Sequence, residues 1–229
     1  LFMLIHYNKK RDKAMKDRTK FLINSFYERN KELNAISEKI SSALDLWINT
    51  FKSGNKMLLC GNGGSCADCD HIAGELMKGF MLKRRMDEAY INGMMSDFGE
   101  EGLKIASKLQ GGLPVISLNA HSALISAFSN DVDASLIYAQ QVIALGREGD
   151  LFVGISTSGN AENVLYAMMA AKNKGLKTMA LTGRDGGRIA QIADISVIAP
   201  EEETFLIQEK HIKIYHLLCA GVESELFED

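Results

Sequence analysis

Two stretches rich in glycine and hydroxyl side chains are the part of this sequence best suited to chemistry. Residues 61–65 are GNGGS and residues 156–159 are STSG, and each stretch lies between an apolar run and a helical pattern. The backbone N–H groups of such a loop, with the N-terminus of the following helix, can bind an anion. A helix N-cap needs one hydroxyl, whereas Ser156, Thr157 and Ser158 supply three. We therefore expect the two loops to hold one phosphate between them, with simple capping as the alternative.

A second group of residues has the side chains of a metal site or of an acid–base pair. His71 and Glu75 are four residues apart, so they share one face of a predicted helix. Gln208 and His216 are separated by a little over two helical turns and lie on roughly one face of another. Two imidazoles, a carboxylate and an amide oxygen suit a divalent metal such as zinc. The same groups can transfer protons without a metal, and the spacing leaves both possibilities open.

The remaining histidines and two of the cysteines carry weaker signals. His211 is on the same predicted helix as the second pair but out of step with it, which favours a structural role. His6 and His121 have no partner that the sequence identifies. Cys66 and Cys69 form a C-x-x-C pattern where a helix begins, a position that lowers thiol pKa values. Because no thioredoxin-like sequence surrounds them, two buried structural thiols are favoured over a redox pair.

The apolar pattern predicts the elements that position these residues. Helical spacing predicts two helices between residues 13 and 51, ending near Gly54, within an N-terminal helical segment 1–54 of a single domain 1–229. Strands alternating with helices give a parallel sheet covered on both faces, with ligands at the carboxyl ends of its strands. The segment 82–112 fits poorly and is predicted as extra helices or a mobile flap. The expected strands are residues 57–60, 114–118, 151–155, 178–181 and 195–198.

Composition excludes several classes of function. The formal net charge is −3, with 26 basic and 29 acidic residues, so the basic excess that drives direct nucleic-acid binding is missing. No stretch has the roughly 18 uninterrupted apolar residues of a membrane helix. The first residues do not match an export signal, and 4 cysteines are too few for a disulfide scaffold. We expect a cytoplasmic protein that acts on a small molecule, with no membrane partner.

Several motifs, taken in order, resemble the SIS (sugar isomerase) family. Within that family the chain is similar to the bacterial phosphoheptose isomerases. The resemblance extends from about Arg18 to Glu225 and is interrupted by residues 82–112. The motifs that carry it are CGNGGS, HIAGE, GREGDLFVGISTSGNAENV, ALTGRDGG and IQEKHIKIYH.

This resemblance implies a three-layer αβα fold with a five-stranded parallel sheet, and a homotetramer whose active sites form between subunits. It implies conversion of sedoheptulose 7-phosphate to D-glycero-D-manno-heptose 7-phosphate through an enediol. Glu75 would be the base and His216 the acid, and one zinc ion per active site would bind His71, Glu75, Gln208 and His216. The N-terminal helices, which carry more apolar surface than one sheet face needs, would join the subunits. The implied substrate and phosphate contacts are Asn62, Gly63, Gly64, Ser65, Asn130, Asp131, Ser156, Thr157, Ser158 and Gln208.

The chain departs from the family pattern at four positions. Ala161 replaces a serine, and Phe205 and Leu206 replace an aspartate and an arginine before the glutamine. Gly79 stands where the family has an arginine, although Lys78 and Lys83 are nearby. These changes affect the identity of the sugar more than the reaction type, so an isomerase of another phosphosugar is one alternative.

Two alternatives without catalysis also remain. One is an interaction module similar to a relative that binds the bacterial replication initiator, which the chain end LLCAGVESELFED resembles. The other is a sugar-phosphate sensor, which would keep the loops but needs no base. Glu75 and His216 favour the enzyme over both, since the interaction module lacks these two residues.

Overall fold

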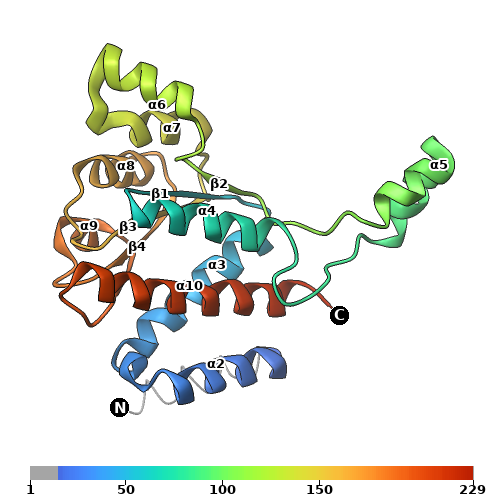
Figure 1. Ribbon diagram of the computed structural model, residues 1–229, viewed down its shortest axis with the longest axis horizontal. Coiled ribbons are helices and arrows are strands. Elements are labelled where there is room, and N and C mark those ends of the chain that lie inside the picture. The colour runs from blue at the N-terminus through green and yellow to red at the C-terminus, as the bar shows by residue number, and fades with distance from the viewer. Residues whose placement is uncertain (1–14, 229) are drawn as a thin grey trace.

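A five-stranded parallel sheet forms the centre of the computed structural model, which describes residues 15–228 (Figure 1). The strand order is β2-β1-β3-β4-β5, and all four pairings are parallel. The predicted strands are confirmed, each within two residues of its expected limits. Their bounds are β1 Met57–Gly61, β2 Val115–Ser117, β3 Leu151–Ser156, β4 Lys177–Thr182 and β5 Ile195–Ile198.

Helices cover both faces of the sheet and complete three layers. Alternate strand residues face opposite sides, so Met57 and Leu59 pack into one core while Leu58 and Cys60 pack into the other. Trp47 lies in the first core. The predicted αβα architecture is therefore confirmed. The first core packs beneath α3 (Ser37–Lys52), α4 (Gly64–Met77) and α10 (Thr204–Leu226), and the second beneath α7 (Ile137–Leu145), α8 (Glu162–Asn173) and α9 (Gly187–Ile192).

The N-terminal segment contains the two expected helices, α2 (Asp17–Arg29) and α3, joined by the 3-10 turn η1 (Lys31–Ile36). Gly54 adopts a φ of 75°, the left-handed conformation in which glycine commonly ends a helix. The Arg18 guanidinium donates to the Ser224 carbonyl, so α2 is tied to the end of α10. His6 lies outside the described residues.

Two excursions leave the compact body. After β2, the chain forms α6 (Ser122–Phe128), the π-turn η2 (Ser129–Asp133) and the 3-10 turn η3 (Ala134–Leu136) before α7. Between α4 and β2 it forms α5 (Glu88–Ala106), which stands away from the body on two extended strands of chain (Figure 1). Of the two alternatives for residues 82–112, the structure has the helical one. No helix within residues 15–228 has the length and apolar character needed to span a membrane.

Candidate active site

The first polar loop joins β1 to α4 and is held by side chains from two other elements. Gly63 has a φ of 55°, which a residue with a side chain rarely adopts, and α4 begins at the next residue. The Tyr138 hydroxyl donates to the Gly61 carbonyl at 2.9 Å. Asn62 and Asn163 exchange two amide hydrogen bonds of 2.8 and 3.0 Å. Since Asn163 lies at the start of α8, this pair links the first loop directly to the element that follows the second.

The second polar loop follows β3, the strand that pairs with β1. Gly61 is in register with Ile155, so the two loops leave the sheet side by side, as predicted. Gly159 has a φ of 65°, and a Cβ there would collide with the Gly186 carbonyl of a third loop. Close packing of the second and third loops explains why the sequence has glycine at position 159.

Three hydroxyls of the two loops are available to a ligand. The side chains of Ser65, Ser156 and Thr157 form no hydrogen bond with any other described residue, although Ser65 and Ser156 are buried. The Ser158 hydroxyl is different, because it accepts from the Asn160 backbone N–H at 3.2 Å and caps its own turn. Capping therefore accounts for one hydroxyl, which leaves the others for an anion such as phosphate.

Two other predicted contacts lie at different distances from these loops. Gln208 projects from α10 over Gly64, where its amide occupies the space that a Cβ would fill. Asn130 and Asp131 lie in η2, exposed to solvent, and form a 2.8 Å hydrogen bond with each other. No hydrogen bond within residues 15–228 joins Asn130 or Asp131 to either loop.

His71, Glu75 and His216 meet towards the C-terminal end of α4. The His71 Nε2 atom is 3.3 Å from Glu75 Oε1, and the rings of His71 and His216 pack edge to face at 5.1 Å. Burial lowers the pKa of His216, His71 lowers it further, and Glu75 acts against both. A group that can be a base therefore lies beside an imidazole held towards its neutral form. Lys78 adds a positive charge 3.3 Å from Glu75 Oε2.

A polar chain behind this cluster orients His71. The Tyr215 hydroxyl donates to Asp68 Oδ1 at 3.2 Å and lies 2.9 Å from His71 Nδ1. Because its single hydrogen goes to Asp68, the hydroxyl oxygen accepts from His71 Nδ1–H. The bond holds the ring so that Nε2 of His71 faces Glu75. Histidines that bind metals are commonly oriented by such a bond to the other ring nitrogen.

The imidazole and carboxylate groups of the cluster are donors that suit a zinc ion, but one chain does not form a complete site. Within residues 15–228, no three His, Cys, Asp or Glu side chains are placed to bind one metal together. Yet His216 Nε2 is buried and has no hydrogen-bond partner, as expected of a nitrogen that awaits a ligand. Gln208, predicted as a fourth ligand, lies at the phosphate loop instead. Eight residues of helix separate it from His216 by about 12 Å.

The candidate site is thus divided between the two ends of α4. The phosphate loop opens the helix at Ser65, and Glu75 lies ten residues later, about 15 Å further along the axis. An extended seven-carbon chain spans less than about 10 Å, since C–C bonds are about 1.5 Å long. The carbon chain of the sugar alone is therefore shorter than the axial separation between the loop and Glu75 of the same chain.

The sequence pattern of the SIS domain family matches residues 23–111 and 105–183 of this chain. Together the two segments cover more than half of its length. The chain belongs to the SIS domain family. Its SIS relatives include the phosphoheptose isomerase of Aliarcobacter butzleri, 37% identical over 86% of this chain and 90% of the relative. That of Citrifermentans bemidjiense is 39% identical over 84% of this chain and 86% of the relative.

Solved SIS structures agree with the fold. Phosphoheptose isomerase from Neisseria gonorrhoeae is 32% identical, with a TM-score of 0.68 over 94% of this chain and 98% of its own. The enzyme from Francisella tularensis is 30% identical, with a TM-score of 0.68 over 91% of this chain and 99% of its own. Both similarities span nearly the whole SIS fold.

His211 and His121 of this SIS chain have hydrogen-bond partners of a structural kind, and the thiols of Cys66 and Cys69 are not activated. His211 is fully buried and donates to the Thr182 carbonyl at 3.0 Å, and burial lowers its pKa to about 4. His121 contacts Gln141 Oε1 at 2.7 Å. Burial raises the pKa of both the Cys66 and the Cys69 thiol, against the lowering expected at a helix N-terminus. Reactive thiolates are thus disfavoured, in line with the structural interpretation.

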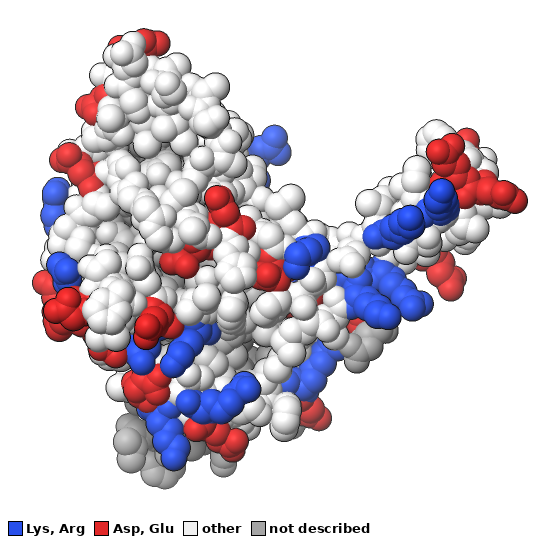
Figure 2. Space-filling model, viewed as in Figure 1, with Lys and Arg blue, Asp and Glu red and all other residues white. Residues whose placement is uncertain are grey.

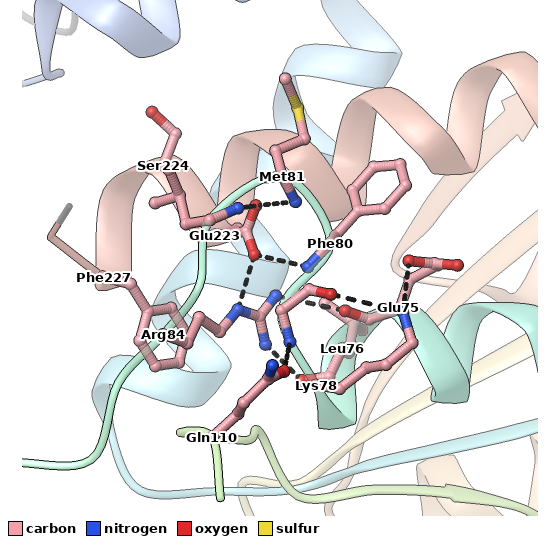
Figure 3. Close-up of polar contacts among 12 residues, drawn as sticks. Glu75, Leu76, Lys78, Phe80, Met81, Arg84, Gln110, Glu223, Ser224 and Phe227 are labelled. Atoms are coloured by element: carbon pink, nitrogen blue, oxygen red, sulfur yellow. Dashed lines mark hydrogen bonds and ion pairs between the residues drawn. The ribbon is translucent and has the colours of Figure 1, made fainter. Parts of the chain in front are cut away.

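Sequence reasoning missed the ion pair that holds the C-terminal end of α4 in this SIS chain (Figure 3). The Arg84 guanidinium bonds the carbonyls of Glu75 and Leu76 at 3.2 and 2.6 Å, and its Nε contacts Glu223 at 2.7 Å. Arg84 and Glu223 are both buried. No local signal could have revealed the pair, because its members are 139 residues apart.

Proposed function

We propose that the chain is an aldose–ketose isomerase that converts sedoheptulose 7-phosphate to D-glycero-D-manno-heptose 7-phosphate through an enediol. The observation that carries this proposal is the meeting of Glu75 and His216 on two adjacent helices, one of which begins in a phosphate-type loop. A sensor or an interaction module has no need for a base and an imidazole placed together. The isomerases named above are similar over most of the chain and support the same reaction.

In this proposal the two loops bind the phosphate of the substrate. Backbone N–H groups of residues 63 and 64 and the free hydroxyls of Ser65, Ser156 and Thr157 supply the donors. Gln208, which lies over Gly64, and Asn130 with Asp131 would contact the sugar. Fixing the phosphate end places the reacting carbons without contributing to the chemical step itself.

The proton transfers are assigned to Glu75 and His216. The Glu75 carboxylate removes a proton from C1 of the ketose while His216 donates one to the oxygen on C2, which gives the enediol. Glu75 then returns its proton to C2, and the hydroxyl on C1 gives its hydrogen to His216 as the aldehyde forms, which restores both residues. Burial lowers the pKa of His216, so the donor is the N–H of a neutral imidazole.

Zinc is part of the proposal, with His71, Glu75 and His216 as the donors that this chain would contribute to a site completed by another subunit. A divalent cation there would stabilise negative charge on the oxygens of the enediolate. The orientation of His71 by Tyr215 and the unpartnered His216 Nε2 support this assignment. Gln208 would join the set only from another subunit, since its own chain places it at the phosphate loop.

The proposal includes a homotetramer with active sites between subunits, and the separation of the loop and Glu75 along α4 supports it. If the loop of one subunit faces Glu75 of another, one substrate can reach both. The cytoplasmic location expected from the sequence stays a prediction, as does the number of subunits.

The test is deuterium uptake at C2 of the product in heavy water, with sedoheptulose 7-phosphate and shorter ketose phosphates as substrates. Loss of a positioned base costs about 10²- to 10⁴-fold in rate, so Glu75→Gln should lose turnover while calorimetry shows nearly unchanged substrate binding. Glu148→Gln, at an exposed carboxylate, is the matched control. If the wild-type protein incorporates no deuterium with any substrate, with or without zinc, the isomerase proposal is wrong.

A further inference from the structure

Helix α5 forms a small hairpin that leaves the body of the molecule; we call residues 83–110 the arm. Gly99 breaks the helix with φ 61° and ψ −144°, so the chain reverses there. Gly102 then packs against the Met94 carbonyl so closely that a Cβ would not fit. At its base, Arg85 and Gln110 form an antiparallel bridge. The arm is therefore a defined helix pair with a tip at Gly99 and a base where it joins the body (Figure 1).

The arm buries little of its own apolar surface. Within α5 only Gly102 and Ala106 are buried. Isolated helices of fewer than about 12 residues are marginal in water, and their stability comes from packing of an apolar face. The exposed side chains of the arm include Phe98 at 65%, Ile105 at 46%, Leu109 at 45%, Met95 at 43% and Leu103 at 41%. An exposed apolar surface of this kind is typical of a protein–protein contact.

The two ends of the arm differ in net charge. The tip is acidic, whereas the base carries three cations together with Asp87 and Glu88, and Lys104 lies between the two ends (Figure 2). A cavity of about 590 Å³ opens at the base, where Ile91 and Leu109 lie beside three cations. Six charged side chains of the arm, three at the tip and three at the base, form no ion pair within residues 15–228. The tip carries Asp97, Glu100 and Glu101, and the base carries Lys83, Arg85 and Lys108.

We propose that the arm pairs with the arm of a second copy of this chain, antiparallel about a two-fold axis. The acidic tip of each arm then lies against the basic base of the other, and the exposed apolar side chains pack between the two hairpins. A two-fold contact must be self-complementary, and a surface that carries both signs at opposite ends meets this condition. Opposite charges at the two ends also fix the antiparallel register.

The geometry allows both charged contacts at once. The first helix of the arm, from Glu88 to Phe98, is about 16 Å long at 1.5 Å per residue. Two such hairpins side by side form a four-helix arrangement, in which short helices bury the apolar face that neither can bury alone. This contact is separate from the N-terminal helices α2 and α3, so it would join subunits at a second place.

Charge reversal tests the pairing, with particle mass measured by sedimentation equilibrium. The tip variant carries Asp97→Lys, Glu100→Lys and Glu101→Lys, and the base variant carries Lys83→Glu, Arg85→Glu and Lys108→Glu. Each variant places like charges at both contacts of its own pair, so each should have half the wild-type mass. An equimolar mixture of the two restores attraction at both ends and should recover the wild-type mass. Arg147→Glu with Lys177→Glu, at exposed sites on the body, should leave it unchanged.

The remaining outcomes overturn the proposal. A wild-type monomer, or wild-type mass in both reversed variants, means that the arms do not pair. Loss of mass that the mixture does not recover means that the arm contacts some other surface. If the control variant Arg147→Glu with Lys177→Glu also loses mass, the effect of charge reversal is not specific to the arm and the pairing is contradicted. Mass is measured without substrate, so the result is independent of the proposed reaction.

Discussion

Arg84 and Glu223 form a buried ion pair that joins the end of α4 to α10, with Arg84 Nε 2.7 Å from Glu223 Oε1. Glu223 also accepts from the backbone N–H groups of Phe80, Met81 and Leu82 at 2.7 to 3.1 Å. Arg84 itself has a φ of 42°, a strained conformation for a residue with a side chain. The pair thus fixes the helix end that carries Glu75, the base of the arm and the helix that carries His216.

Replacement of Arg84 should be costly. Arg84→Met leaves Glu223 buried without its partner and frees the Glu75 and Leu76 carbonyls, so we expect a loss of about 3–5 kcal/mol in the free energy of unfolding. Urea denaturation measures it. Arg147→Met removes an exposed arginine and should change the free energy by less than about 0.5 kcal/mol. Equal losses in the two variants would show that the buried pair contributes no more to the free energy of unfolding than an exposed arginine does.

The loop hydroxyls should act on substrate binding and leave the chemical step intact. Ser156→Ala with Ser158→Ala removes one free donor of the proposed phosphate site and the hydroxyl that accepts from the Asn160 backbone N–H in the same loop, so KM should rise while kcat changes little. Steady-state kinetics with sedoheptulose 7-phosphate separates the two constants. Ser42→Ala, at an exposed serine on α3, is the control. Unchanged substrate affinity in the double variant would show that these loops do not bind the phosphate.

Metal content should depend on His71 and not on His211. We expect the purified protein to contain zinc, measured by elemental analysis, and His71→Ala to lose it because one imidazole ligand is gone. His211→Gln changes a histidine that bonds the Thr182 carbonyl on the sheet side of α10, so it should keep the metal. A wild-type protein that binds no zinc after dialysis against it would contradict the assignment.

Stability should fall in mild acid because of His211. Burial lowers its pKa in the folded protein from 6.5 to about 4, so the unfolded chain binds the proton more readily between these values. The stabilising contribution is therefore complete above about pH 6.5 and declines as the pH falls towards 4, by up to about 3 kcal/mol. Urea denaturation of wild type and His211→Gln across this range measures it. Equal pH dependence of stability in both proteins would show that groups other than His211 cause it.

Local patterns predicted the fold because its strands are short, apolar and separated by helices. The expected strand 195–198 matches β5 at both ends. Strand β2 is shorter than expected, and the residue before it, Pro114, still accepts a hydrogen bond from Met57. Proline lacks the N–H that a full place in the ladder requires. The alternation of strands and helices therefore identified the architecture, and the chemistry of single residues set the strand ends.

The candidate site was predicted in its parts but not in its arrangement. Spacing placed Gln208 and His216 on one helix face, but it could not identify their neighbours, which are Gly64 for Gln208 and His71 for His216. The partner of His71, Tyr215, lies 144 residues away in the chain. Glycines in the arm, such as Gly99, weaken the helical pattern and left that segment undecided. Contacts between distant segments need the folded chain.

The separation of Ser65 and Glu75 by three turns of α4 has a genetic consequence. A protein with Glu75→Gln and a protein with Ser156→Ala and Ser158→Ala, the latter assayed at a substrate concentration far below its raised KM, have their defects in opposite halves of the proposed shared site. In a mixed assembly, some sites would combine an intact loop from one parent with an intact base from the other. Co-expression of the two alleles should therefore restore part of the isomerase activity that neither has alone. If each site were contained in one chain, no mixture would recover activity.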